Sequence, residues 1–167
     1  PDDRHRRCDG EADLMTNAGR LAGIARHSEP GGPIETLEAG EVTRGHGLKG
    51  DMRGGLKGKP YRRQISLIET EAFARASAEA GAADVRWSAT RRNLLVDGFT
   101  LQRAPGTWLR IGESCLLEIT GECTPCARMD GVHPGLQAAL TPDWRGGALA
   151  MVIEPGRIAI GDEIRIE

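Results

Sequence analysis

The fold is decided by the stretch Trp108-Leu-Arg-Ile-Gly-Glu-Ser-Cys-Leu-Leu-Glu-Ile119, where Ile-Gly-acid separates two largely apolar runs. A glycine at this point favours a tight turn between antiparallel strands. The same Ile-Gly-acid pattern recurs in Ile158-Ala-Ile-Gly-Asp-Glu-Ile164. We therefore expect a hairpin at each place, formed by two similar turns rather than by a tandem repeat.

Further short strands are expected on both sides of these turns, because brief apolar runs alternate with glycine-containing breaks. The expected strands lie at 21–26, 34–43, 64–68, 93–96, 108–111, 115–119, 148–153, 157–160 and 163–166, the second range holding one or two. A helix is expected over Glu69–Ala80 with Gly81 as its stop, and another near Gly135–Leu140. Many strands and few helices predict a mainly β (α+β) fold, a closed or nearly closed barrel with peripheral helices.

One domain is expected, since 167 residues are too few for two well-buried cores. Residues 1–18 are polar and aperiodic, so we expect a flexible N-terminal extension before a single domain over residues 19–167. The net charge of −2 gives no general attraction to nucleic acid. No run approaches the roughly 20 apolar residues of a membrane span, and the first eight residues do not read as a secretory signal. The expected location is the cytoplasm, with reduced thiols and neither nucleic acid nor membrane as a partner.

A glycine-rich basic stretch covers residues 45–63. Gly45-His-Gly-Leu-Lys-Gly50 spells the dinucleotide-binding pattern, but no helix signal follows it, and Pro60 after Lys59 excludes a phosphate loop. Six cations offset only Asp51: Lys49, Arg53, Lys57, Lys59, Arg62 and Arg63. The stretch is therefore either an anion-binding loop or a solvated one.

The most specific short pattern is Cys123-Thr-Pro-Cys126, which permits a redox disulfide, half a zinc site or a single activated thiol. Zinc is disfavoured because there is no second cysteine pair. A thioredoxin-like enzyme needs a long run of strands and helices after the motif, and only 41 residues remain. A purely packing role suits Cys123 better than Cys126.

In Arg91-Arg-Asn-Leu94, Asn93 by itself reads as a turn residue.

Several motifs in order resemble the MOSC domain (molybdenum cofactor sulfurase C-terminal), over nearly the whole chain from about Gly19. They are Gly47-Leu-Lys-Gly-Asp51, Arg91-x-Asn93-Leu94, Trp108-x-x-Ile-Gly112, Thr124-Pro-Cys126, Arg145-Gly-Gly147 and Ile160-Gly-Asp162. The resemblance implies a strand-rich barrel, found in molybdenum cofactor sulfurases, in amidoxime-reducing components and as free-standing bacterial proteins.

The resemblance also implies a site. Cys126 matches the family cysteine, which carries sulfur as a persulfide or ligates molybdenum. Arg91 and Asn93 match a polar pair lining its pocket, and Asp51 closes the glycine motif. Lys49 and Arg128 complete the candidate cofactor-binding residues. The implied activity is sulfur transfer or molybdenum-pterin binding, with reduction of N-hydroxylated compounds as one outcome.

Three partner classes follow from this resemblance: a small-molecule or cofactor ligand, a sulfur donor, and an electron-transfer protein. Pyridoxal phosphate belongs to a separate domain in full sulfurases, so none is expected on this chain. Two other functions stay open. One is a thiol–disulfide redox module that uses Cys123 with Cys126, and the other is a non-catalytic module that binds a small ligand.

Overall fold

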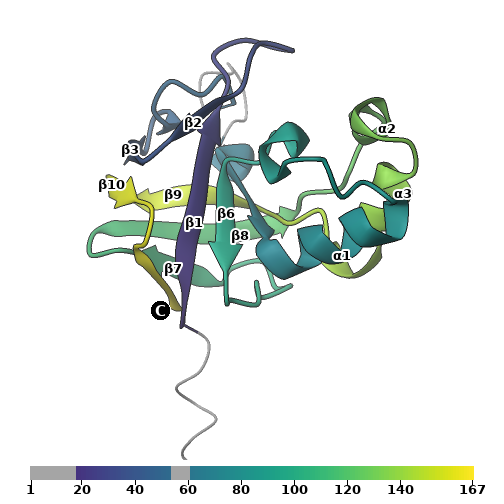
Figure 1. The fold of residues 1–167 in the computed structure, drawn as a ribbon. Helices are drawn as coiled ribbons and strands as arrows, with labels where there is room; N and C mark the ends of the chain where they lie inside the picture. The colour runs from purple at the N-terminus through teal and green to yellow at the C-terminus, as the bar shows by residue number, and fades with distance from the viewer. Residues whose placement is uncertain (1–17, 54–60) are drawn as a thin grey trace, which may run out of the picture.

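The computed structural model describes residues 18–53 and 61–167, which form a mainly β structure with helices at one side (Figure 1). Its strands are β1 (Ala18–Arg26), β2 (Glu35–Leu37), β3 (Ala39–Thr43), β4 (Gly47–Leu48), β5 (Ile65–Glu69), β6 (Leu94–Asp97), β7 (Trp108–Ile111), β8 (Cys115–Glu122), β9 (Ala148–Glu154), β10 (Gly156–Ala159) and β11 (Glu163–Ile166). The helices are α1 (Thr70–Ala80), α2 (Arg128–Val132) and α3 (Leu136–Leu140), with 3-10 turns η2 (Tyr61–Arg63), η3 (Trp87–Thr90) and η4 (Pro142–Trp144). The extension predicted for residues 1–18 lies, Ala18 apart, outside the described residues.

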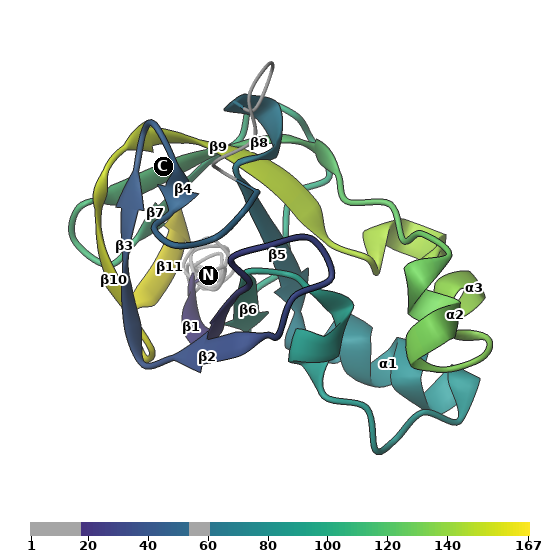
Figure 2. The ribbon, with the colours of Figure 1, turned by 90° about the horizontal axis from the view of Figure 1, so that it is seen from above.

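The main sheet closes into a barrel, so the predicted fold class is confirmed. Its strand order is β11-β7-β8-β9-β5-β6-β1-β2, and β1 also pairs with β11, which joins the two ends of the row. β1 therefore has three partners, which are β6, β11 near the start of β1 and β2 near its end. Figure 2 shows the strands curling round on one side of the molecule and the helices grouped on the other.

Of the two predicted hairpins, one is confirmed and one is wrong. β7 and β8 pair across the turn, with Ile111 opposite Cys115. β10 instead joins β3 in a second, three-stranded sheet, whereas β11 pairs with β1 and β7. The reason is closure of the barrel, because the turn between β10 and β11 bonds to Leu21 of β1. Leu21 N donates to Asp162 O (2.8 Å), and Gly161 N donates to Leu21 O (2.8 Å).

Two apolar clusters share strand β5. Ile65 and Leu67 belong to the barrel core, and Ile68 belongs to a second cluster beneath α1 and α3. Because both faces of β5 are covered, all residues from Ile65 to Ile68 are buried. The predicted strand is thus present, and its outer face is where the helices attach.

The helix predicted to end before Gly81 is present. α1 stops where Gly81 adopts a left-handed conformation (φ 68°), which glycine reaches without strain. The predicted helix near Gly135–Leu140 is present as α3, but α2, only five residues long, was not predicted. Among the described residues no helix is long and apolar enough to cross a membrane.

Asn93 holds three strands together from the interior. Its Oδ1 accepts hydrogen bonds from Ser66 N (3.0 Å) and Ser66 Oγ (3.1 Å), while its Nδ2 donates to Ala25 O (3.2 Å). The side chain is fully buried, so these bonds replace water completely. Asn93 is a structural clamp between β5, β6 and β1 rather than a surface turn residue.

The clamp predicts a stability defect in Asn93→Ala. The substitution leaves Ser66 N and Ala25 O without their side-chain partner in the interior, at a cost of about 3 kcal/mol. Chemical denaturation measures the loss. Asp97→Ala, at the exposed end of β6, is the control and should change the unfolding free energy by less than about 0.5 kcal/mol. Equal effects of the two substitutions would disprove the clamp.

Candidate functional site

A cavity of about 170 Å³ forms where the segments leaving β1, β4 and β8 meet the segment that enters β6. The described residues that line it are His27, Arg53, Thr90, Arg91, Arg92, Cys126, Arg128 and Met129. Four of these eight are arginines, and none carries a carboxylate. The cavity therefore combines one thiol with strong positive charge.

Cys126 is the thiol in this cavity, and it is exposed. It lies between β8 and α2, and its carbonyl accepts the first hydrogen bond of that turn, from Met129 N (2.9 Å). The two other described cysteines are buried. Burial raises the pKa of the Cys115 thiol to about 12, so Cys115 stays protonated and unreactive at neutral pH. Among the described thiols, Cys126 is the one that reagents in solution can reach.

The guanidinium of Arg92 fixes the segment that carries this thiol. Arg92 is 5% exposed and donates to Gly146 O (2.9 Å), Thr90 O (2.9 Å) and Cys123 O (3.1 Å). β6 and β8 are separated in the sheet by β5 and β9, so the side chain reaches across two strands. Three of its five donors, one on each nitrogen, are taken by these carbonyls, and its charge contributes to the cavity.

Gly147 allows the same segment to approach the sheet. A Cβ on Gly147 would lie 1.8 Å from Leu67 O, and its φ of +97° is strained for other residues. The carbonyl of Gly147 accepts a hydrogen bond from Cys123 N (2.9 Å). The Arg145-Gly-Gly147 motif thus acts through backbone packing behind the thiol.

Three other arginines face the cavity with donors to spare. Arg91 adopts a left-handed conformation (φ 64°) and uses Nη1 for one bond to Gly32 O (3.2 Å). The Nε of Arg53 is buried and has no hydrogen-bond partner within the described part of the chain. Burial lowers the pKa of the Arg53 guanidinium, although arginine stays charged in proteins. Arg128 is exposed on α2.

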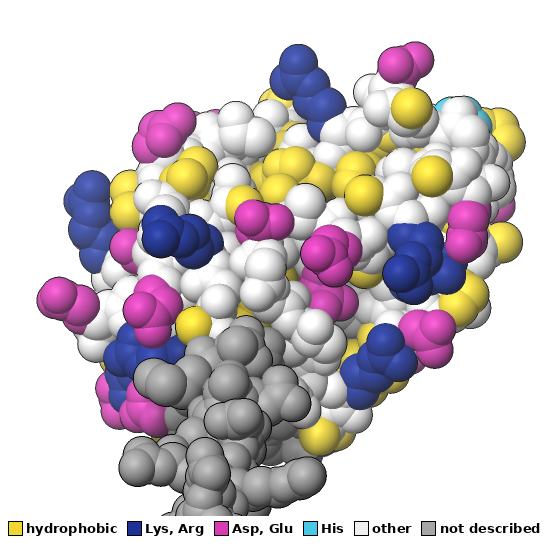
Figure 3. Space-filling view, turned by 60° about the horizontal axis from the view of Figure 1, so that its bottom comes forward, with side chains coloured by type: hydrophobic (Ala, Val, Ile, Leu, Met, Phe, Trp, Pro, Cys, Tyr) yellow, Lys and Arg dark blue, Asp and Glu magenta, His cyan; other side chains and the backbone are white. Residues whose placement is uncertain are grey.

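This concentration of positive charge is local. On the face shown in Figure 3, acidic and basic side chains are interspersed. The whole chain carries a formal charge of −2. The cavity therefore stands out from the rest of the molecule as a place where an anion is favoured.

His27 and Asp51 form a buried pair at the cavity wall. Asp51 Oδ1 lies 3.6 Å from His27 Nδ1 and accepts a bond from His27 N (3.1 Å), and its Oδ2 accepts one from Arg53 N (3.0 Å). Burial lowers the pKa of His27, with Arg91, Arg53 and Arg128 adding to the effect and Asp51 opposing it. His27 is therefore a neutral imidazole at pH 7.

The candidate residues from the sequence fall into two groups. Cys126, Arg91 and Arg128 line the cavity together. Asp51 lies behind its wall, against His27. Asn93 is a clamp in the core, and Lys49 is on the surface, where its Nζ is 3.3 Å from Glu41 Oε2. Lys57 and Lys59 of the basic stretch lie outside the described residues.

Sequence reasoning missed several residues of the cavity: His27, Thr90, Arg92 and Met129, with Arg53 noted only for its charge. His27 follows directly after β1, where a single histidine carries no signal. Arg92 was missed because the motif Arg91-x-Asn93 leaves its middle position unspecified. Residues 91 to 93 lead into β6, and successive side chains of an extended segment point to opposite faces. This alternation was the available signal that one of these three side chains would point in a different direction from the other two.

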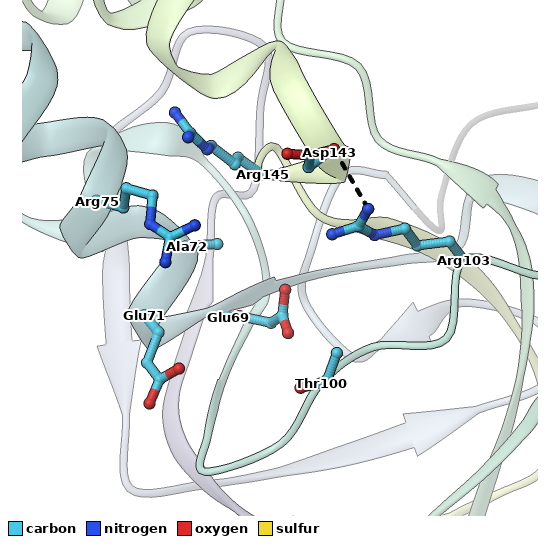
Figure 4. A pocket seen from close by; sticks show the side chains of 8 residues that line it. All are labelled: Glu69, Glu71, Ala72, Arg75, Thr100, Arg103, Asp143 and Arg145. Atoms are coloured by element: carbon cyan, nitrogen blue, oxygen red, sulfur yellow. Dashed lines mark hydrogen bonds and ion pairs between the residues drawn. The ribbon is translucent and has the colours of Figure 1, made fainter.

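A second pocket shares no lining residue with the first (Figure 4). It contains three acids and three arginines, with Ala72 and Thr100: the charged residues are Glu69, Glu71, Asp143, Arg75, Arg103 and Arg145. Arg103 Nη1 lies 3.5 Å from Asp143 Oδ1, and burial raises the pKa of Glu69. Its charges balance and it has no thiol, so thiol chemistry belongs to the first cavity.

The chain belongs to the MOSC domain family, whose model matches residues 26–165. The structure is similar to the YuaD protein from Bacillus subtilis, with a TM-score of 0.74 and 20% identity over 89% of this chain and 95% of that one. It is also similar to YiiM from Escherichia coli, with a TM-score of 0.65 and 19% identity over 89% of this chain and 69% of that one. For YiiM from Geobacillus stearothermophilus the TM-score is 0.61 and the identity 16%, over 89% of this chain and 73% of that one. At these identities the likeness concerns the fold. No curated protein sequence matches the chain significantly.

The buried imidazole predicts a pH-dependent stability. Because the pKa of His27 is lower in the folded protein, the unfolded chain binds the proton first when the pH falls below the ordinary pKa of 6.5. The free energy of unfolding should therefore decrease as the pH drops from 6.5 towards the folded pKa. Denaturation at several pH values should show this component in the wild type and its loss in His27→Gln.

The matched control is His46→Gln, at an exposed position. It should keep the wild-type pH dependence between pH 7.5 and 5.5. A His27→Gln profile parallel to the wild type would contradict the assignment.

Proposed function

We propose that this MOSC protein carries sulfur as a persulfide on Cys126. The observation that carries the proposal is the exposure of this one thiol in a cavity of four arginines, while Cys115 and Cys123 are buried. A thiolate is the nucleophile in sulfur exchange, and it must be accessible. Membership of the MOSC family supports the same chemistry.

The residues around Cys126 suit such a carrier. Arg92 and Gly147 hold the backbone on either side of Cys123, which orients the segment ahead of Cys126. Arg91 and Arg128 supply charge for an anionic reactant. The proposed partners are a sulfur donor and a sulfur acceptor, and the proposed location is the cytoplasm, where free thiols persist.

Binding of the molybdenum cofactor is a second candidate, favoured by the donor set. A soft thiolate suits molybdenum, and the Nε of Arg53, which has no partner among the described residues, suits a phosphate oxygen, so the residues fit this group. Cys126 would hold the metal, and Arg53, Arg91 and Arg128 would hold the pterin phosphate. When bound, the cofactor would supply a redox centre for reducing N-hydroxylated compounds, with an electron-transfer protein as partner.

A redox pair of Cys123 with Cys126 is less well supported. Cys123 is 5% exposed, and its backbone is engaged by Arg92 and Gly147, which leaves little freedom for exchange with solution thiols. A non-catalytic binding module would use the same arginines without the thiol.

The carrier role predicts different behaviour of the two cysteines. After exposure of the protein to a sulfur donor, mass spectrometry should find one additional sulfur atom on Cys126. Cys126→Ser should lose it completely, because the nucleophile is gone. Cys123→Ser should retain at least about half of the loading, because that side chain packs in the interior.

Loss of loading in both variants would favour the cysteine pair. For the second candidate, protein purified from cells that make molybdenum cofactor is analysed for molybdenum and phosphate. Stoichiometric metal that disappears in Cys126→Ser would support cofactor binding. Absence of both persulfide and metal would overturn both candidates.

A further inference from the structure

We propose that the sulfur donor is a small oxyanion bearing a sulfane sulfur, such as thiosulfate or an organic thiosulfonate, whose oxygens lie among Arg53, Arg91 and Arg128. This inference rests on the proposed persulfide chemistry of Cys126 and names its substrate class. The structural basis is the juxtaposition of a reactive thiol with guanidinium groups in one small cavity.

The charge of the lining selects an anion. Its four guanidinium groups face no carboxylate within the described lining, and the nearby Asp51 already accepts bonds from His27 N and Arg53 N. The imidazole of His27 is neutral and does not change this balance. Against four guanidinium groups the carboxylate of Asp51 supplies one negative charge, so an uncharged polysulfide would leave most of the positive charge uncompensated, whereas an oxyanion compensates it.

The unused donors match oxygen atoms. Arg92 uses three of its five donors on carbonyls, one on each nitrogen, so the other arginines have more donors available. Arg53 presents a buried Nε that has no partner in residues 18–53 and 61–167, and Arg91 uses one of its five donors, on Gly32 O. Several guanidinium groups converging from different segments suit a tetrahedral oxyanion, which accepts hydrogen bonds in several directions.

The size of the cavity selects a small donor. The cavity volume is about 170 Å³. Thiosulfate has five heavy atoms and fits this space. Sites for drug-sized molecules are larger, about 300–1,000 Å³. A thiosulfonate with a longer organic group would keep its sulfonyl end in the cavity and extend the rest towards solvent, past the exposed Cys126 and Arg128.

The transfer step balances without an outside oxidant or reductant. The Cys126 thiolate attacks the sulfane sulfur of thiosulfate and forms a new S–S bond. The donor's own S–S bond breaks, and its electron pair leaves with sulfite. The products are a Cys126 persulfide and sulfite, whose negative charge the arginines stabilise as it develops. A nucleophilic acceptor then takes the outer sulfur, and the thiolate returns.

The test uses the purified full chain with thiosulfate as donor and cyanide as acceptor, and follows thiocyanate formation. We expect turnover that is absent in Cys126→Ser. Arg128→Gln and Arg91→Gln should each raise KM for thiosulfate about tenfold or more, since each removes a charge-assisted hydrogen bond. Arg157→Gln, on the exposed part of β10, is the matched control and should leave KM within about twofold. Thermal melting verifies that the variants are folded.

A neutral dialkyl trisulfide serves as the comparison donor. It separates a failure of the oxyanion donor from a failure of sulfur carriage by Cys126. The Cys126 thiolate attacks its central sulfur, which leaves a mixed trisulfide on Cys126 and releases an alkanethiolate; an added alkanethiol then takes the alkylthio group as a dialkyl disulfide and leaves the Cys126 persulfide. This loading should be equal in the wild type and in the arginine variants, because the trisulfide carries no charge. Loading by the trisulfide without loading by millimolar thiosulfate would overturn the oxyanion donor and leave sulfur carriage standing. Loading by neither donor would overturn both. Turnover of thiosulfate with unchanged KM in both arginine variants would also overturn the inference.

Discussion

The guanidinium of Arg92 is the contact on which the site depends. Its donors meet carbonyls at residues 90, 123 and 146, which belong to segments far apart in the sequence. A buried cation without an opposing carboxylate is tolerated only where carbonyl dipoles surround it. The same bonds that satisfy Arg92 thus fix the chain just before Cys126, and its charge remains available to the cavity.

The barrel supplies the rigid frame for this contact. β5 is covered on both faces, by the core within and by α1 and α3 outside, and Asn93 ties it to its neighbours. The residues that line the cavity lie on the segments connecting the strands of this frame rather than on the strands themselves. A packed scaffold with reactive groups on its connections is a common division of labour in proteins, since loops can vary without loss of the core.

Much of the fold could be predicted because its signals are local. Alternation and glycine breaks indicated the strands, and Gly81 marked the end of α1. The expected hairpin at Ile158–Ile164 was wrong because the partner of β11 is set by closure onto β1, which a turn motif does not encode. α2 was missed because five residues offer no helical period.

The candidate site was predictable in part for a similar reason. Cys126 could be singled out from its motif and family order, and Arg91 and Arg128 lie with it around the cavity. His27 could not, because its significance comes from Asp51, 24 residues later in the chain. Asn93 drew attention as a polar group before a strand, yet its position in the core depends on Ser66 and Ala25, which no local pattern connects to it.

Closure of the barrel has a consequence for synthesis of the chain. Of the strands in the described residues, β1 is made first, and its pairing at Ala18–Arg20 is with β11, which is made last. Until β11 has emerged, that edge of β1 lacks its native partner, and an open strand edge is a template for pairing with other chains. The native barrel can be completed only after residue 165 has emerged from the ribosome.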